Sequence, residues 1–390
     1  MKTFKELGLS NDLVKNIQKL GFTKPTQIQE MSIPHIMKGT DVIGQSSTGS
    51  GKTLAFGCGI IHQVIHERGI QAIVLTPTRE LAEQVRNDLD ELSNKKIRIT
   101  AIYGGVSIEP QINELHRTDV VVATPGRLLD HLERRTINMS KVKFLVLDEA
   151  DRMLDMGFID DVEKIIKTCP EKRQTLFFSA TISSSIKRLA DRYMNKPVSV
   201  SAEKMVDPRK LKQVYYDVQK NMKFSLLVHL LKHEKSELIM VFCNTRENTD
   251  FVAKNLKING INAIPIHGGL AQNSRTKTIG LFDEGKAGVL VCTDVAARGL
   301  HIENISHVYN YDIPRESKNY VHRIGRTARA GEQGKVINLL CDYEHDNFSR
   351  ILKDYREFSI KKIEKPYIER VNIISTGARR HNSHIRRRRY

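Results

Sequence analysis

The residues best suited to chemistry form a short run at 46–53 with the sequence SSTGSGKT. This run follows the short apolar segment 41–44 and leads into a helix-compatible segment that starts at Leu54. Glycines let backbone N–H groups close around phosphates, and a helix N-terminus favours an anion there. Lys52 can then reach the β- and γ-phosphates, and Thr53 offers a hydroxyl to Mg²⁺. We therefore favour a nucleotide site over a glycine-rich turn without a ligand.

A second candidate centre is the tetrapeptide DEAD at 148–151, which directly follows the apolar run 144–147. A carboxylate at such a position can hold Mg²⁺ through water, and its neighbour can orient or deprotonate an attacking water. Gln27, about twenty residues before the glycine-rich run, could pair with an adenine edge, with Phe4 stacked on the base. Taken alone, this stretch favours a plainer interpretation, in which Phe22 and Ile28 belong to the core and Gln27 is a polar loop residue.

The elements that would position these residues alternate along the first half of the chain. Apolar runs typical of buried strands occupy residues 72–75, 120–123, 144–147 and 175–178. Between the first two runs, Leu81, Val85, Leu89 and Leu92 fall on one helical face. Strands that alternate with helices predict a parallel, doubly wound sheet, whose ligands gather at the carboxyl ends of the strands.

A second alternating series follows a polar stretch near residues 201–212. Its predicted strands are 238–242, 263–266, 289–292, 307–310 and 336–340. This alternation predicts a second parallel-sheet domain. It contains no glycine-rich run of the kind that binds phosphate. The segment 322–329 places three arginines in seven residues, as a solvated surface could also do. With a nucleotide site in the other domain, arginines that reach its phosphates are the stronger interpretation.

Composition sets the class of protein. The chain has 390 residues, which suggests about two domains, and 40% of them are hydrophobic, as in an ordinary globular protein. No apolar run approaches the ~20 residues of a membrane helix, and the N-terminus lacks the apolar core of a signal peptide. The five cysteines are widely spaced, which favours neither a disulfide framework nor a zinc site. We expect a cytoplasmic protein whose net charge of +17 favours a polyanionic partner, most simply nucleic acid.

The last stretch of the chain, 366–390, is strongly basic. It holds seven arginines and one glutamate, which leaves a net charge of +6. Few apolar residues follow Ile374, so we expect this segment to be disordered. It is either a solvating end or a non-specific tether for RNA.

Together these motifs resemble the DEAD-box family of ATP-dependent RNA helicases over roughly residues 4–345. Residues 148–151 spell the family's namesake tetrapeptide, and residues 179–181 (SAT) are another of its signatures. The resemblance implies an α/β fold of two tandem RecA-like, doubly wound parallel-sheet domains, with the ATP and RNA sites across the interdomain cleft. The expected division is a first domain at 1–205, a linker at 206–213, a second domain at 214–365 and the basic tail at 366–390.

The resemblance also implies roles for individual residues. The nucleotide contacts would be Phe4, Lys24, Gln27, Thr48, Gly49, Ser50, Gly51, Lys52, Thr53, Asp148 and Gly299, with Thr53 and Asp148 on Mg²⁺. The catalytic residues would be Lys52, Glu149 as base, Arg326 and Arg329 as arginine fingers, and His322, which with Asp151 couples the domains. The RNA track would be Pro77, Thr78, Arg79, Gly105, Thr124, Pro125, Gly126, Arg127, Thr245, Gly268, Arg275 and Thr293.

Three positions depart from the family's pattern. Ser46 stands where a smaller residue, usually alanine, is common, and Ala328 stands where glycine is common. His301 replaces an aspartate thought to contact the ribose of the nucleotide. The last departure puts this ribose contact in doubt, but not the phosphate contacts.

The expected activity is RNA-stimulated ATP hydrolysis, with ATP and Mg²⁺ as cofactors, coupled to unwinding of short RNA duplexes or remodelling of ribonucleoproteins. RNA would be held without sequence specificity, by a protein that acts as a monomer, with possible ribonucleoprotein or degradation-complex partners. An ATP-gated RNA clamp that seldom unwinds is the main alternative. A DNA helicase with the same ATP-hydrolysing motifs is a second alternative. An inert structural protein would lack catalytic residues, yet Lys52, Glu149 and Arg326 are all present.

Overall fold

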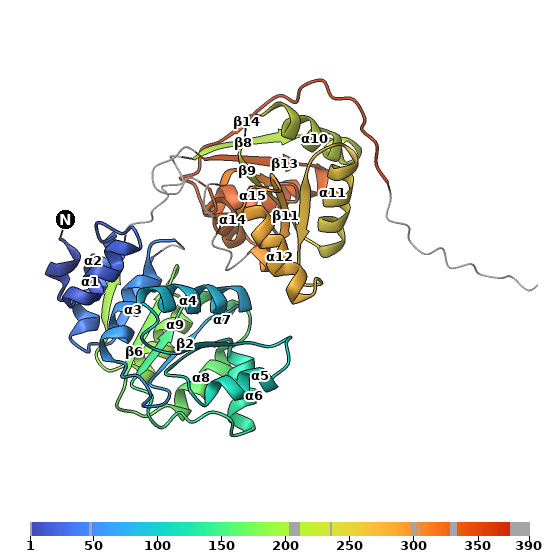
Figure 1. Ribbon diagram of the computed structural model, residues 1–390. Coiled ribbons are helices and arrows are strands. Elements are labelled where there is room, and N and C mark those ends of the chain that lie inside the picture. The colour runs from blue at the N-terminus through green and yellow to red at the C-terminus, as the bar shows by residue number, and fades with distance from the viewer. Residues whose placement is uncertain are drawn as a thin grey trace, which may run out of the picture. The chain divides into compact units, whose positions relative to one another are not determined.

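The chain forms two compact units, whose described residues run from 2 to 202 and from 211 to 374. The computed structural model describes residues 2–46, 49–202, 211–234, 236–297, 302, 305–327 and 334–374 (Figure 1). The expected linker, 206–213, spans the division between the units. Its last two residues differ from that expectation, because Lys212 and Gln213 already belong to a strand, and Leu211 before them is buried.

The first unit alternates strands and helices along its whole length. Its elements are η1 (Phe4–Leu7), α1 (Asn11–Lys19), α2 (Gln27–Met37), β1 (Val42–Gln45), α3 (Lys52–Gln63), β2 (Ala72–Leu75), α4 (Arg79–Leu92), β3 (Ile99–Ile102), α5 (Glu109–Leu115), β4 (Val120–Ala123), α6 (Pro125–Glu133), β5 (Phe144–Leu147), α7 (Ala150–Asp155), α8 (Ile159–Thr168), β6 (Gln174–Ser179), α9 (Ser184–Tyr193) and β7 (Val198–Ser201). The predicted strands 72–75, 120–123 and 144–147 match β2, β4 and β5.

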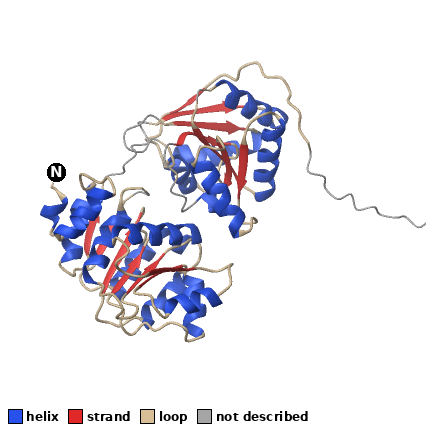
Figure 2. Ribbon diagram, in the orientation of Figure 1, coloured by secondary structure: helices blue, strands red, loops and turns tan. Residues whose placement is uncertain are grey.

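The second unit repeats this alternation. Its elements are β8 (Lys212–Asp217), η3 (Lys220–Met222), α10 (Lys223–His233), β9 (Leu238–Cys243), α11 (Arg246–Ile258), β10 (Ala263–Ile266), α12 (Gln272–Asp283), β11 (Val289–Thr293), α13 (Asp294–Ala297), β12 (Ile305–Asn310), α14 (Ser317–Ile324), β13 (Lys335–Leu340), η4 (Asp342–Glu344), α15 (His345–Asp354) and β14 (Ile360–Lys362). As in the first unit, helices pack around a central sheet (Figure 2).

Each unit contains one seven-stranded parallel sheet. The strand orders are β3-β4-β2-β5-β6-β1-β7 and β10-β11-β9-β12-β13-β8-β14. Every strand pair in both sheets is parallel. The predicted fold class, two doubly wound parallel-sheet domains, is therefore confirmed.

Apolar side chains on alternate strand residues build a core on each face of the first sheet. On β2, Val74 faces the core shared with α2, α3 and α4, whereas Ile73 faces the core shared with α6, α8 and α9. The predicted helical stripe at Leu81, Val85 and Leu89 is buried in the first of these cores. With both faces covered, the strands can be apolar throughout, which explains their continuous hydrophobic runs. Polar side chains that could bind a ligand or react are therefore expected at the strand ends.

The segment 366–374 differs from the expected disorder. It runs along the second unit, where Ile368 and Val371 pack against the core that α10 and α11 share with the sheet. Asn255 of α11 accepts a hydrogen bond from the Ile374 N–H at 2.7 Å and donates to the Ile374 carbonyl at 3.2 Å. Apolar packing and side-chain amides that satisfy an extended backbone fix this part of the chain, an effect that charge content alone does not predict. Residues 375–390 lie outside the described residues.

Among the residues that the structure describes, no helix combines the length and the apolar character needed to cross a bilayer.

Candidate functional site

The strand order of the first unit divides the carboxyl edge of its sheet into two halves. Strands β5, β6 and β1 are neighbours, so the segments that follow them, 148–151, 179–181 and 46–51, share one half. Strands β3, β4 and β2 are also neighbours, which places 103–106, 124–127 and 76–79 on the other half. The predicted nucleotide and RNA residues of this unit therefore fall on adjoining halves of one edge.

The glycine-rich loop leads from β1 into α3. Gly49 and Gly51 have left-handed backbones, with φ of 78° and 88°, and Gly51 caps the N-terminus of α3. Ser46 is buried and accepts a hydrogen bond from the Ser50 hydroxyl at 2.8 Å. The serine that departs from the family pattern is thus tied into the loop instead of disturbing it. Thr48 lies outside the described residues.

Gln29 fixes the end of this loop from α2, although the sequence reasoning did not single it out. Its side chain is buried and donates to the Gly51 carbonyl at 3.0 Å. Thr26 donates to the Ser50 carbonyl at 2.7 Å, and its own N–H donates to the Gln29 amide oxygen at 2.9 Å. A side chain at Gly51 would meet Gln29, since an added Cβ would lie 2.2 Å from its Nε2. The T-x-x-Q capping-box pattern at 26–29 was the available signal for this role.

Lys52 and Asp148 form the charged centre of the site. The Lys52 Nζ lies 3.9 Å from Oδ1 of Asp148, and both side chains are almost fully buried. That Nζ has no hydrogen-bond partner among the described residues. Burial raises the pKa of Asp148 to about 6, although Lys52 acts in the opposite direction. A buried ammonium without a hydrogen-bond acceptor fits a phosphate, and a buried carboxylate beside it fits a cation such as Mg²⁺.

Glu149 adopts an unusual backbone. It is the N-cap of α7 with a left-handed φ of 52°, and its N–H donates to Asp148 at 2.9 Å. Its carboxylate pairs with the guanidinium of Arg152, and both side chains are buried. A non-glycine residue in this conformation is uncommon and is often found at functional sites.

Asp151 connects the end of β5 with the end of β6. Its carboxylate accepts hydrogen bonds from the N–H and hydroxyl of Thr181 at 2.8 and 2.9 Å. Its own N–H donates to the Ser179 hydroxyl at 3.1 Å. The segments 148–151 and 179–181 therefore form one hydrogen-bonded unit beside the glycine-rich loop.

The predicted adenine-side residues lie in different environments. Phe4 is 3% exposed and belongs to the core of the first unit. Lys24 and Gln27 are exposed. The structure thus places Gln29 against the end of the phosphate loop, while a contact of Phe4 or Gln27 with a base stays a prediction.

On the other half of the edge, two arginines converge on the loop after β3. The Arg127 Nη2 donates to the Val106 carbonyl at 2.8 Å. The Arg79 guanidinium lies so close to Gly105 that an added Cβ there would be 2.1 Å from its Nη1. Thr78 accepts from the Leu81 N–H and caps α4. Pro77 is buried, whereas Thr124 and Pro125 lead into α6 and Gly126 is exposed with open space beside it.

The second unit places its predicted residues at equivalent strand ends. Thr245 is exposed and caps α11 by accepting from the Asn248 N–H at 3.1 Å. Gly268 is exposed after β10, Arg275 lies in α12, and Thr293 ends β11. His322 is half-buried in α14, and Arg326 follows that helix with a buried side chain. Gly299, Arg329, His301 and Ala328 lie outside the described residues.

Two family models match the chain. One is the DEAD/DEAH box helicase model, over residues 26–189, and the other is the helicase conserved C-terminal domain, over residues 222–331. Together they cover more than half of the sequence. The chain belongs to the DEAD/DEAH box helicase family.

Curated relatives and solved structures are similar along most of the helicase. It is 46% identical to the DEAD-box ATP-dependent RNA helicase CshA of Bacillus cereus, over 90% of this chain and 68% of that protein. It is 44% identical to the ATP-dependent RNA helicase CshA of Listeria monocytogenes, over 94% of this chain and 71% of that protein. S. cerevisiae Dbp5 bound to RNA and ADP BeF3 matches with a TM-score of 0.83 and 31% identity, over 94% of this chain and 96% of that one.

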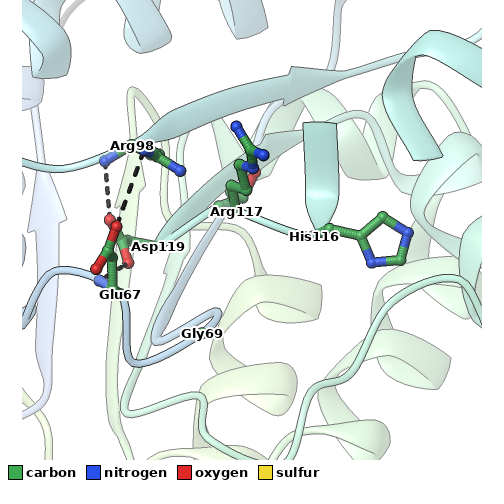
Figure 3. A pocket seen from close by; sticks show the side chains of 7 residues that line it. Glu67, Gly69, Arg98, His116, Arg117 and Asp119 are labelled. Atoms are coloured by element: carbon green, nitrogen blue, oxygen red, sulfur yellow. Dashed lines mark hydrogen bonds and ion pairs between the residues drawn. The ribbon is translucent and has the colours of Figure 1, made fainter. Parts of the chain in front are cut away.

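A separate cavity of about 420 Å³ lies at the amino ends of β2, β3 and β4 in the helicase (Figure 3). Its buried Asp119 accepts hydrogen bonds from the Glu67 and Arg98 N–H groups at 2.8 and 2.9 Å and contacts His66 at 2.7 Å. The Asp119 carboxylate therefore ties together the chain segments that enter the three strands. Both oxygens are engaged in that structural role, at the edge opposite the predicted sites.

Proposed function

We propose that this chain, an ATP-dependent RNA helicase, hydrolyses ATP at the edge formed by β1, β5 and β6. The observation that carries the assignment is the buried Nζ of Lys52, which has no hydrogen-bond partner in the part of the chain that the structure describes and lies 3.9 Å from the buried carboxylate of Asp148. Lys52 would bind the β- and γ-phosphates, and the loop that ends at Gly51 would surround them. Glu149 would orient and deprotonate the attacking water.

Mg²⁺ would be held by Thr53 and Asp148. Thr53 stands in the first turn of α3, beside Lys52, and Asp148 provides a carboxylate at the end of β5. Mg²⁺ usually takes one or two protein oxygens together with phosphates and water, so the described residues need not form a closed cage. When bound, the ion would neutralise charge on the transferred phosphoryl group.

Arg326 and Arg329 would complete the site as arginine fingers when the two units close. A finger accelerates phosphoryl transfer by about 10³–10⁵-fold, which corresponds to ~4–7 kcal/mol. That magnitude is enough to make hydrolysis depend on closure. If closure also requires RNA, ATP turnover becomes RNA-dependent.

RNA would be bound by its sugar–phosphate backbone along the predicted track. Arginine side chains and exposed glycines, such as Arg79, Arg127 and Gly126, suit contacts with phosphate and close backbone approach. Such contacts carry little sequence information, so we expect weak sequence preference. The bound strand would be bent in the closed form, which would exclude its complement and separate a short duplex. The monomeric state, the cytoplasmic location and any ribonucleoprotein partners stay predictions.

The decisive experiment compares ATP turnover with and without single-stranded RNA, alongside displacement of a short RNA duplex. We expect RNA to raise turnover by at least 10-fold and the duplex to be separated only when ATP is present. RNA-stimulated turnover without strand displacement would favour the clamp, and equal stimulation by DNA would favour a DNA helicase. Equal turnover with and without RNA would refute the proposed coupling.

A further inference from the structure

Arg323, the first arginine of the 322–329 segment, has its guanidinium in the interior of the second unit. It lies in α14 and is 1% exposed. Its Nε and Nη2 donate to the two carboxylate oxygens of Asp294 at 2.6 and 2.7 Å. Its other hydrogen bonds go to Asn244 at 2.9 Å, to Asn310 at 3.1 Å and to the Asp312 carbonyl at 2.5 Å. An arginine has five N–H donors, so these five hydrogen bonds use them all, and Arg323 cannot serve as a finger.

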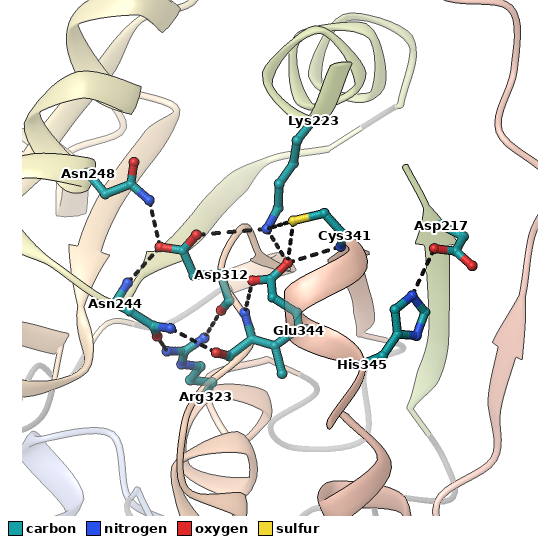
Figure 4. Close-up of polar contacts among 10 residues, drawn as sticks. Asp217, Lys223, Asn244, Asn248, Asp312, Arg323, Cys341, Glu344 and His345 are labelled. Carbon is teal, nitrogen blue, oxygen red and sulfur yellow. Dashed lines mark hydrogen bonds and ion pairs between the residues drawn. The ribbon is translucent and has the colours of Figure 1, made fainter. Parts of the chain in front are cut away.

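These bonds join α14 to the carboxyl ends of three strands. Asn244 follows β9, Asp294 follows β11, and Asn310 ends β12. Figure 4 shows the guanidinium between Asn244 and the Asp312 backbone. Two of the three ends also carry predicted RNA contacts, because Thr245 follows Asn244 and Thr293 precedes Asp294.

The same helix turn leads to the predicted finger. Arg326 is three residues beyond Arg323, and its N–H donates to the Arg323 carbonyl at 3.1 Å. Thr327 closes the turn by donating to the Ser306 carbonyl at 3.2 Å. The position of Arg326 is therefore set by a turn whose side-chain anchor is Arg323.

We propose that the Asp294–Arg323 pair is a positioning pair, which links contact with RNA at Thr293 to placement of Arg326 for ATP hydrolysis. This inference rests on the proposed roles of Thr293 and Arg326. This bidentate pair, with a buried guanidinium and a partly exposed carboxylate, is stiff, because loss of Asp294 leaves the buried Arg323 charge unsatisfied. Movement of the β11 end on binding RNA would therefore move α14 with it.

The alternative is that the pair only stabilises the second unit. A matched control for that role is Tyr320, which lies in the same helix and donates a buried hydrogen bond to Gln213 at 2.8 Å. Its hydroxyl also accepts from Asn338 at 3.2 Å, and Asn338 in turn accepts from Asn310, so this hydroxyl reaches Arg323 only through two intervening side chains. Tyr320→Phe thus removes a buried hydroxyl from α14 and leaves every direct hydrogen-bond partner of Arg323 in place.

The experiment measures ATP turnover at saturating poly(U), affinity for poly(U) and melting temperature for Asp294→Asn, Arg323→Lys and Tyr320→Phe in the full chain. We expect Asp294→Asn and Arg323→Lys to lower RNA-stimulated turnover by about 10–100-fold, whereas ATP affinity without RNA changes less than about twofold, because Lys52 and Asp148 are elsewhere. Tyr320→Phe should lower the melting temperature but keep turnover within about twofold. Asp294→Glu should recover part of the lost turnover.

A double-mutant cycle with Arg326→Ala separates the possible failures. If the pair acts through the finger, Asp294→Asn should cost little more in the Arg326→Ala background. Unchanged RNA-stimulated turnover in folded Asp294→Asn and Arg323→Lys, or a fully additive loss, would overturn the inference. So would a turnover loss in Tyr320→Phe equal to theirs. If Arg326→Ala itself turned over ATP at the wild-type rate, the proposed finger would be wrong instead.

Discussion

The two units have the same strand order, but the buried lysines at equivalent positions have different partners. In the first unit, Lys52 begins the helix after the first strand and lies 3.9 Å from Asp148, at the end of the fifth. In the second, Lys223 begins the corresponding helix and lies 3.8 Å from Asp312, at the end of the corresponding strand. The second lysine, however, also pairs with buried Glu344 at 2.5 Å (Figure 4).

The connections that precede these lysines also differ between the two units. Six residues, two of them glycines with positive φ, connect β1 to α3 in the first unit. Five residues without glycine connect β8 to α10 in the second, and three of them form a tight 3₁₀ turn. A loop without glycines cannot direct successive N–H groups at a phosphate as readily. The carboxylate of Glu344 accepts from Lys223, whereas the Lys52 Nζ has no acceptor among the described residues.

The segments proposed to bind RNA are alike in both units. Thr78 and Thr245 each cap the helix after the second strand and are each followed by an arginine and a glutamate. A pair of glycines follows the third strand in both units, and the arginine lies against one of them, Gly105 or Gly268. The units therefore differ at the phosphate loop and agree at the strand ends proposed for RNA.

The largest expected contrast is in catalysis. Lys52→Met should lower RNA-stimulated ATP turnover by at least about 10³-fold, since the charge aimed at the phosphates is lost. Glu149→Gln should do the same but retain ATP and RNA binding, because the side chain keeps its shape and loses only its basicity. Lys223→Met should leave the turnover of folded protein within about threefold. A steady-state ATPase assay checks all three, and wild-type turnover by Glu149→Gln would mean that the base is elsewhere.

For stability, we expect Lys223→Met to have the larger effect and Lys52→Met the smaller. Lys223→Met leaves the buried carboxylates of Glu344 and Asp312 without their cation and should destabilise the second unit by about 3–5 kcal/mol. Lys52→Met removes a buried cation that has no hydrogen bond to any described residue, so it should cost less than about 1 kcal/mol or even stabilise the free protein. Urea unfolding of the two variants tests this contrast. Equal destabilisation would show that the two lysines are not held differently.

Gln29 and Gln27 offer a finer test of the first unit. Gln29→Ala should weaken ATP binding by about 10-fold or more, because the Gly51 carbonyl loses its buried partner and the loop loosens. Gln27→Ala, at an exposed position, should weaken binding less than about threefold and alter preference between ATP and GTP if this side chain reads adenine. Titration with both nucleotides measures these effects. A greater loss for Gln27→Ala would return the dominant role to that residue.

The basic end of the chain can be divided at the limit of its packed part. Removing residues 375–390 takes away six arginines but keeps the contacts of Ile368 and Val371. RNA binding should weaken, and the slope of log K against log salt should flatten by about 2–4 units, since each neutralised phosphate contributes about −0.7. Turnover at saturating RNA should stay within about twofold. An unchanged affinity and slope would leave the segment as a solvating end.

A pH effect on stability is the smallest prediction. The folded pKa of Asp148 is raised to about 6 from 3.8, so its contribution to stability is fully present below about pH 4 and is lost as pH rises through 6. The difference is at most about 3 kcal/mol. Asp148→Asn lacks this titration, so the unfolding free energy of the wild type should fall relative to that variant between pH 4 and 6. Parallel curves would place the pKa near its ordinary value.

Much of the fold was predictable because both faces of each sheet are covered. Strands such as 72–75 and 263–266 then read as continuous apolar runs with clear ends, and those ends carry the chemistry. The phosphate loop and the acidic pair were each predicted at a strand end, but the close approach of Lys52 to Asp148 was not predicted.

Other parts of the site depend on tertiary contacts that spacing does not encode. Arg323 and Arg326 have the same residue type in one short segment, and only the packing of α14 makes the first an internal anchor. Gln29 differs from Gln27 only by the face of α2 that it occupies. The packing of 366–374 rests on side-chain amides of α11 that meet its backbone.

The most direct test of the account is the number of ATP molecules bound per chain, measured by titration calorimetry with Mg²⁺ and a non-hydrolysable ATP analogue. We predict one site in the wild type, none in Lys52→Met and one in Lys223→Met. A second site in the wild type, or a site that persists in Lys52→Met, would contradict the conclusion that only the first unit keeps its lysine available to a nucleotide.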